Sequence, residues 1–191
     1  MEPLLAVNDK IMFYKYLDKA TVYFEYGCGG STYQAYIRNN IFIIYSVESD
    51  MQWLNKLKSQ IKSDKLIFFY NDMDTQDNSW GAPGKNSTNE QRINYSNHML
   101  NLTKDQQLEI DFIMIDGRFR VACCLKCFDI IKSDCLIAFD DFLNRSAYTI
   151  VLDYYDIIEK TLDNRMVILQ KKTNITSIPE DVIRKYELIA N

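Results

Sequence analysis

Val22-Tyr23-Phe24-Glu25-Tyr26-Gly27-Cys28-Gly29-Gly30-Ser31 is the stretch from which the fold can be read. The β-branched and aromatic residues up to Tyr26 are typical of a buried strand, and the glycines after them indicate a tight turn. Helical patterning follows from Ser31 to Arg38, so that Ser31 lies near the first turn of a helix. Strand, glycine turn and helix in this order are the first half of a βαβ unit.

The same alternation continues along the rest of the chain. Further strands are predicted at residues 41–47, 66–70, 111–115, 135–139, 157–161 and 165–171. Further helices are predicted at residues 8–19, 50–61, 98–107, 120–131, 146–155 and 179–189. Strands that alternate with helices imply a mostly parallel sheet with helices on both faces. The last two strands flank Leu162-Asp163-Asn164, a hairpin turn that would add one antiparallel strand.

A long polar stretch, residues 71–97, interrupts this alternation and contains Gly81, Pro83 and Gly84. A structureless loop of this length inside a compact domain is usually functional or disordered. The insert, about residues 71–100, is expected to cover the carboxyl edge of the sheet as a lid that selects what binds there. It also carries Trp80, Tyr95 and His98, the only histidine of the chain.

Size and composition place limits on the class of protein. The 191 residues, 47% of them hydrophobic, fit a single domain spanning residues 1–191. The net charge of −4, without a dense Lys/Arg cluster, argues against a nucleic-acid partner. No apolar run approaches the roughly 18–20 residues that a membrane span needs. The start lacks a signal-peptide pattern, so we expect a cytoplasmic location, or the host cytoplasm if the chain is viral. A homodimer and a place in a larger multidomain chain both stay open.

Three of the five cysteines form the cluster Cys123-Cys124-x-x-Cys127. One interpretation is a zinc site, which needs a fourth ligand. The other interpretation, favoured here, is that these are small apolar side chains on a buried helix in a reducing compartment.

In a sheet of this kind, ligands bind beyond the carboxyl ends of the strands. The loop with Gly27 and Gly29 has no third glycine at the spacing of a dinucleotide fingerprint, which counts against NAD. Glu48, at the end of the second strand, is placed to accept hydrogen bonds from two ribose hydroxyls, whereas Asp50 fits better as a helix cap. Asp72, after the third strand, could accept from an adenine amino group or simply form a turn.

Together these features resemble the class I S-adenosylmethionine-dependent methyltransferases. Residues 22–29 match their first motif, Val47-Glu48 the acidic end of strand two, and residues 111–117 the strand-four motif. The resemblance spans residues 21–171 and implies an α/β fold, a Rossmann-like doubly wound sheet of seven strands with a C-terminal antiparallel hairpin. Residues 116–122 and 80–83 also look like a little-characterised bacterial branch of this superfamily. The resemblance implies S-adenosylmethionine as cofactor, with contacts from Glu25, Gly27, Cys28, Gly29, Ser31, Thr32, Glu48, Ser49, Asp72 and Asp116.

Carboxylates follow the fourth and fifth strands. Asp116 ends one strand and Asp140-Asp141 the next, and adjacent parallel strands would bring them together. Such a cluster repels itself unless it is protonated or neutralised by a cation, and oxygen ligands suit Mg²⁺ or another divalent cation. The arrangement is similar to catechol O-methyltransferase-like enzymes, in which an Asp after strand four and an Asp-Asn pair after strand five hold Mg²⁺. Asp141 stands where that family has Asn. The alternative is that Arg118, Arg120 or Arg145 neutralises the acids.

The residues expected to carry catalysis are Asp116, Arg118 and His98. A carboxylate or a histidine beside the site could remove the proton of a hydroxyl acceptor. This pattern favours methyl transfer to a hydroxyl of a sugar, a glycan or another small molecule. Two alternatives stay open: a nicotinamide-dependent oxidoreductase on a similar sheet, and a non-catalytic methyltransferase-like binding domain.

Overall fold

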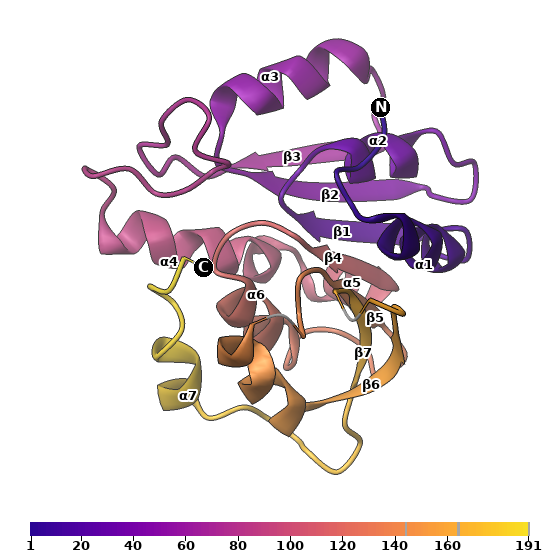
Figure 1. Ribbon diagram of the computed structural model, residues 1–191, viewed down its shortest axis with the longest axis vertical. Coiled ribbons are helices and arrows are strands. Elements are labelled where there is room, and N and C mark those ends of the chain that lie inside the picture. Colours follow the sequence, from indigo (N-terminus) through magenta and orange to yellow (C-terminus); the bar gives the residue numbers. More distant parts are fainter. Residues whose placement is uncertain (144, 164, 191) are drawn as a thin grey trace.

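The structure, a computed structural model, describes residues 1–143, 145–163 and 165–190. Within them the chain forms a seven-stranded sheet in the order β3-β2-β1-β4-β5-β7-β6 (Figure 1). In this sheet β7 runs antiparallel to both of its neighbours, and the other pairs are parallel. The predicted fold class, a mostly parallel sheet with a terminal hairpin, is therefore confirmed. The strands are β1 (Val22–Tyr26), β2 (Ile43–Glu48), β3 (Leu66–Tyr70), β4 (Phe112–Ile115), β5 (Leu136–Phe139), β6 (Tyr155–Lys160) and β7 (Val167–Lys171).

Helices cover both faces of the sheet because side chains along each strand alternate between the two faces. Phe24 and Tyr26 of β1 belong to a core shared with α4 and α6, whereas Tyr23 packs on the other face with α1 and α2. The helices of the described residues are α1 (Val7–Leu17), α2 (Gly30–Tyr36), α3 (Met51–Gln60), α4 (Asn89–Asn97), α5 (Lys104–Glu109), α6 (Arg120–Cys127) and α7 (Glu180–Arg184), with 3₁₀ turns η1 (His98–Asn101) and η2 (Ser146–Asp153). The longest of them has 11 residues, too short to cross a membrane.

The strand register brings the carboxyl ends of the central strands to one edge. Tyr26, the last residue of β1, pairs with Val47 of β2 on one side and Ile115 of β4 on the other. The ladders continue one residue further: the Gly27 amide donates to the Val47 carbonyl at 2.9 Å, and the Asp116 amide donates to the Tyr26 carbonyl at 3.1 Å. The glycine loop and the acidic ends of β2 and β4 are thus held side by side.

The 71–97 stretch was predicted as a loop, but its last third is the helix α4. Thr88 accepts from the Gln91 amide, and the Gln91 side chain accepts from the Thr88 amide, which is a capping box. The predicted helix at 98–107 is split, because a second capping box at Thr103 and Gln106 starts α5. Both capping boxes can be recognised in the sequence as Thr followed three residues later by Gln, but the prediction relied on apolar periodicity and overlooked them.

Further boundaries differ from the prediction, among them the end of α6, which lies at Cys127 and not at residue 131. Most of the predicted helix 146–155 is the 3₁₀ turn η2, which ends at Asp153 before β6 begins at Tyr155, and the C-terminal helix is confined to Glu180–Arg184. The predicted hairpin turn includes Asn164, which lies outside the described residues.

Candidate cofactor-binding site

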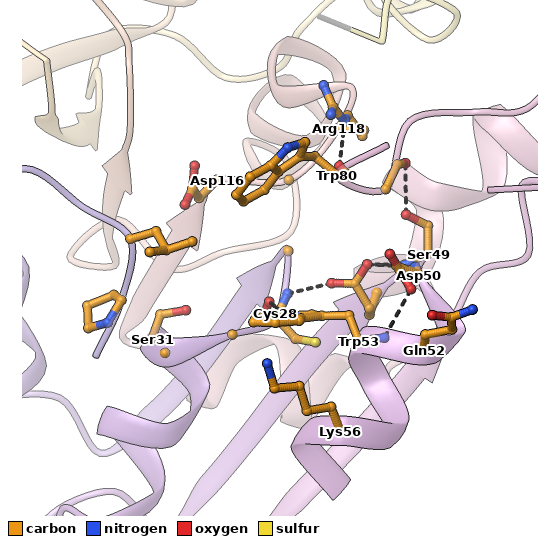
Figure 2. Close-up of a pocket in the computed structure, with 18 of the residues that line it drawn as sticks. Cys28, Ser31, Ser49, Asp50, Gln52, Trp53, Lys56, Trp80, Asp116 and Arg118 are labelled. Carbon is orange, nitrogen blue, oxygen red and sulfur yellow. Dashed lines mark hydrogen bonds between the residues drawn. The ribbon is translucent and has the colours of Figure 1, made fainter. Parts of the chain in front are cut away.

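A cavity of about 450 Å³ opens at the carboxyl edge of the sheet (Figure 2). This volume lies in the range of small-molecule sites. The walls come from the glycine loop, the end of β2, the first turn of α3, the 78–81 segment of the insert and the end of β4. Eight residues predicted for cofactor binding or catalysis line it: Gly27, Cys28, Gly29, Ser31, Glu48, Ser49, Asp116 and Arg118.

The glycine loop depends on backbone conformations and distances that a side chain would disturb. Gly27 has φ of +94°, and a Cβ atom there would lie 2.8 Å from the Gly117 Cα. Gly29, by contrast, has open space on the cavity side, with its nearest neighbour, Trp53 Nε1, at 3.5 Å. Gly27 therefore shapes the turn, while Gly29 leaves room for a ligand.

Glu25 lies beneath the loop, outside the cavity lining. It is fully buried, and its carboxylate accepts hydrogen bonds from Tyr23, Ser31, Thr32 and Ser46. Burial raises the pKa of Glu25 to about 7, against the lowering effect of these hydrogen bonds. Glu25 ties the start of α2 to the sheet and so holds the loop from behind.

Thr32 has the same supporting position. Its hydroxyl donates to Glu25 and accepts from the Gly29 amide at 2.8 Å. Neither Glu25 nor Thr32 reaches the cavity, so the structure separates these two predicted cofactor contacts from the seven that line it.

Glu48 lies at the tip of β2 with 6% of its surface exposed. One carboxylate oxygen accepts from the Cys28 amide at 3.0 Å, and the other from the amides of Ser49 and Asp50 at 2.7 and 2.8 Å. Burial raises the pKa of Glu48, and these hydrogen bonds act against the rise. The Asp50 side chain accepts from the Trp53 amide at 3.0 Å, which confirms Asp50 as the helix cap. Glu48 thus links the glycine loop to the end of β2, and it lines the cavity where the ribose was predicted to bind.

Hydrogen bonds from Ser49 and Arg118 hold the 79–81 segment of the insert beside the cavity. The Ser49 hydroxyl donates to the Gly81 carbonyl at 3.0 Å. The Arg118 guanidinium donates to the carbonyls of Trp80 and Ser79 at 2.9 and 3.0 Å. Trp80 keeps 73% of its surface exposed, although it lines the cavity. The segment 79–81 therefore forms a roof whose indole ring is free to meet a ligand.

Several residues that line the cavity were not predicted for it. Trp53 donates its indole N–H to the Cys28 carbonyl at 2.7 Å, and Figure 2 shows it on the wall opposite Trp80. Lys56 lies over the Trp53 ring at 4.7 Å. Pro3 and Leu4 reach the cavity from the N-terminal segment. Trp53 could have been predicted from its position in the first turn of α3, directly after the cap Asp50. No local sequence pattern indicates that Pro3 or Leu4 would reach the cavity.

Asp72 and His98 lie away from the cavity lining. Asp72 is exposed and accepts from the Asp74 amide at 3.0 Å, as in the turn interpretation. His98 Nε2 lies 3.1 Å from the Asn71 side-chain oxygen, and its ring stacks on Phe69. Burial lowers the pKa of His98 to about 4, so its ring is neutral at neutral pH. His98 thus has a packed position outside the cavity lining.

The predicted acidic residues meet at the ends of β4 and β5. Asp116 lines the cavity, while Asp140 and Asp141 lie beside it and outside the lining. Arg120 pairs with all three, and its closest carboxylate contact is Nη2 to Asp116 Oδ1 at 2.9 Å. No group of three His, Cys, Asp or Glu residues in the described ranges is arranged to hold a metal ion. The alternative of arginine neutralisation therefore describes this cluster better than a divalent cation.

The three clustered cysteines lie in α6 and are buried in the core. Burial raises the pKa of Cys123, Cys124 and Cys127, which keeps their thiols protonated. Their environment is that of small apolar core residues, as favoured from the sequence.

No protein-family profile matches the sequence, and no curated protein sequence does. Solved structures share its fold. A methyltransferase-like protein from Silicibacter pomeroyi is 21% identical, with a TM-score of 0.81 over 100% of this chain and 98% of that one. An RNA methyltransferase from Salinibacter ruber, crystallised with S-adenosyl-L-homocysteine, is 14% identical, with a TM-score of 0.52 over 94% and 97% of the two chains. A tRNA methyltransferase from B. subtilis is 12% identical, with a TM-score of 0.52 over 88% and 67%.

These likenesses establish the fold. The chain has a Rossmann-like fold that it shares with these methyltransferase structures, which confirms the fold that the resemblance implied.

Proposed function

We propose that the protein is an S-adenosylmethionine-dependent methyltransferase that acts on a hydroxyl of a small molecule, with sugars and glycans as the first candidates. The single observation that carries this proposal is that predicted site residues from separate strand ends meet at one cavity. The glycine loop, Glu48 and Asp116 come from three separate strand ends, and all of them line one cavity of about 450 Å³. The methyltransferase fold of the solved neighbours supports the choice of cofactor.

The residues present fit this cofactor. Gly29 leaves space where a ligand can approach the backbone, and Glu48 offers the acidic acceptor that a ribose requires. Ser49, Trp80 and Gly81 form an adjoining wall of mixed polarity, suited to a flat ring such as adenine. When bound, S-adenosylmethionine supplies a methyl group already activated by its sulfonium.

The chain itself then has to orient the acceptor and take up its proton. The acceptor oxygen forms the new C–O bond, and the C–S bond breaks with its electron pair left on sulfur. We assign the proton of the acceptor hydroxyl to the Asp116 carboxylate, because it is the acid of the β4–β5 cluster that lines the cavity. The roof at 79–81 is placed to select the acceptor and to limit water.

A hydroxyl of a small molecule is favoured over nucleic acid by charge. The net charge of −4 would repel a polyanionic backbone, although two of the solved neighbours are described as RNA or tRNA methyltransferases. The acceptor class therefore rests on this chain's own composition and on the acid at the cavity.

Calorimetric titration with S-adenosylhomocysteine tests the cofactor. Saturable binding of one ligand per chain is expected, and no binding at millimolar ligand would overturn the proposal. NAD is the matched control, and it should leave the melting temperature unchanged under conditions in which S-adenosylhomocysteine raises it. A panel of sugars and small alcohols with labelled cofactor then tests the acceptor, and cofactor binding without transfer to any of them would favour a non-catalytic role.

A further inference from the structure

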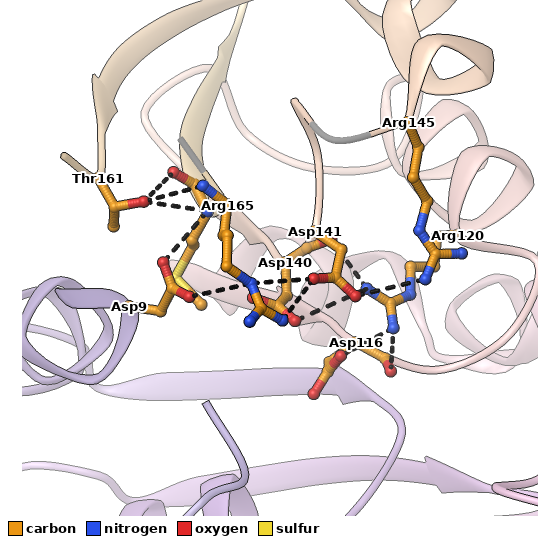
Figure 3. Close-up of polar contacts among 9 residues, drawn as sticks. Asp9, Asp116, Arg120, Asp140, Asp141, Arg145, Thr161 and Arg165 are labelled. Carbon is orange, nitrogen blue, oxygen red and sulfur yellow. Dashed lines mark hydrogen bonds and ion pairs between the residues drawn. The ribbon is translucent and has the colours of Figure 1, made fainter. Parts of the chain in front are cut away.

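The guanidinium of Arg120 occupies the centre of the acidic cluster at the ends of β4 and β5 (Figure 3). Arg120 is the first residue of α6 and is 9% exposed. Its Nε donates to the Gly117 carbonyl at 3.0 Å, Nη1 to the Asp140 carbonyl at 2.8 Å, and Nη2 to the Asp116 carbonyl at 3.1 Å. Backbone acceptors from both strand ends thus fix the guanidinium in place.

The same group faces the carboxylates. Nη2 lies 2.9 Å from Asp116 Oδ1, while Nη1 lies 3.8 Å from Asp140 Oδ2 and 3.7 Å from Asp141 Oδ2. A divalent cation shared by these acids would compete with Arg120 for the same three oxygens. The divalent cation would also have to displace the guanidinium of Arg120, which three backbone carbonyls hold. The displaced guanidinium would then be a buried charge without its partners, which is unfavourable.

Further arginines complete the neutralisation of Asp141. Arg165 Nη2 lies 2.7 Å from one of its oxygens, and Arg145 Nη2 lies 3.4 Å from the other. Arg165 also reaches the buried Asp9 at 3.9 Å, so the network extends from the β4 end to α1 (Figure 3). Asp141, which stands where the metal-binding family has Asn, is therefore bound to arginines on both sides.

We propose that Arg120 is the resident cation of this site, in the position that the resemblance gives to Mg²⁺, and that the site uses no divalent metal. Arg120 holds the Asp116 carboxylate at the cavity wall and so acts as a positioning residue, since its own atoms do not line the cavity. The role of Arg120 in methyl transfer rests on the proposed function, whereas the exclusion of a divalent cation depends on the charges of the folded chain alone.

One oxygen of the cluster makes a specific test available. Asp140 Oδ1 is buried and has no hydrogen-bond partner among the described residues. If the positive charge of Arg120 is removed, Asp141 keeps Arg145 and Arg165, but the carboxylates of Asp116 and Asp140 lose their cation and form an oxygen-rich site suited to a hard cation. A variant without the arginine should therefore gain cation binding that the natural protein lacks.

The test titrates Mn²⁺ and Ca²⁺ into the full, metal-stripped chain. Calorimetry measures the binding, and the melting temperature measures its effect on stability. The wild type should show no saturable heat at millimolar cation, and its melting temperature should not rise. Arg120→Met, which keeps volume and loses charge, should melt lower and regain stability with added cation. Arg145→Met is the matched control, because Arg145 contacts only Asp141 of the three acids, and it should gain no such cation response.

A wild type that binds one cation per chain, with binding lost in Asp116→Asn, would overturn the proposal. A folded Arg120→Met that gains no cation affinity would overturn it as well. If Arg120→Met does not fold, the uncharged Arg120→Gln replaces it, and the wild-type calorimetry still decides between the two outcomes. Where methyl transfer is measurable, Arg120→Lys should lower kcat without changing the affinity for S-adenosylhomocysteine, and chelation should leave wild-type activity intact. Failure of the cofactor titration would overturn the proposed function and leave the cation result standing.

Discussion

Gly27 and Gly117 touch through their backbones across the ends of β1 and β4. A Cβ atom on Gly27 would lie 2.8 Å from the Gly117 Cα, and one on Gly117 would lie 2.9 Å from the Gly27 nitrogen. Distances under 3.0 Å to backbone atoms cannot be relieved by rotation of a side chain. The glycine loop and the acidic strand-four motif, far apart in the sequence, therefore depend on each other for their shape.

Gly27→Ala should destabilise the fold, because the variant combines a strained φ of +94° with a backbone clash. We expect a loss of about 2–5 kcal/mol in the free energy of unfolding, measured by urea denaturation. Gly29→Ala is the matched control in the same loop, since its Cβ atom would meet only ordinary contacts. Equal stability of the two variants would refute this account of the loop.

Glu48→Gln should weaken S-adenosylhomocysteine binding. The variant keeps the size of the side chain but loses the charged acceptor, so a decrease of about 10- to 100-fold is expected. Calorimetry measures the affinity, and a urea titration checks that the Cys28, Ser49 and Asp50 amides still hold the fold. Asp72→Asn is the control at the neighbouring strand end, outside the cavity, and should bind like the wild type.

The buried Glu25 should make stability depend on pH. Its folded-state pKa of about 7 lies above the usual 4.5, so the folded chain binds a proton that the unfolded chain releases between these values. Stability is therefore highest below the lower pKa and declines as the pH rises to the higher one, by about 3 kcal/mol for this group. Glu25→Gln cannot ionise and should lack this part of the decline in urea titrations across that range. The exposed Glu90→Gln should follow the wild type.

Asp116 and His98 give opposite expectations for catalysis. Asp116→Asn keeps the shape of a cavity residue and removes the proton acceptor, so kcat should fall by about 10²- to 10⁴-fold while cofactor affinity changes little. His98→Gln should lower the melting temperature, because the buried contact with Asn71 is altered, and should leave kcat near the wild-type value. A larger kcat loss in His98→Gln than in Asp116→Asn would return the role of base to His98.

Gly81→Ala should loosen the roof of the cavity. Gly81 has φ of +73°, and a Cβ atom there would lie 2.7 Å from the Ser49 hydroxyl oxygen. Faster dissociation of S-adenosylhomocysteine is expected, measured by stopped-flow fluorescence of the tryptophans. Removing the hydroxyl in the double variant with Ser49→Ala should restore part of the residence time, since it relieves the clash but not the backbone strain. Additive effects of the two changes would show that they act separately.

Much of this architecture could be predicted from local sequence. Short runs of β-branched, aromatic and other apolar residues mark the buried strands, and the glycines after Tyr26 mark a tight turn. These signals depend only on backbone geometry, and they located the strands, the hairpin, the glycine loop and the acidic strand ends. In α4 two local signals disagreed: the polar composition indicated a loop, whereas the capping box at Thr88 and Gln91 indicated the start of a helix. The prediction followed the composition and was wrong there.

The roles of individual side chains at the site were decided by tertiary structure. Glu25 and Glu48 look equivalent as acids beside a strand end, yet one is buried under α2 and the other lines the cavity. Likewise the sequence by itself determined that acids follow β4 and β5, but left open whether a metal or an arginine neutralises them. Only the packing of α6 against the sheet places Arg120 among them, because contacts between distant segments depend on register and close packing, which no local pattern encodes.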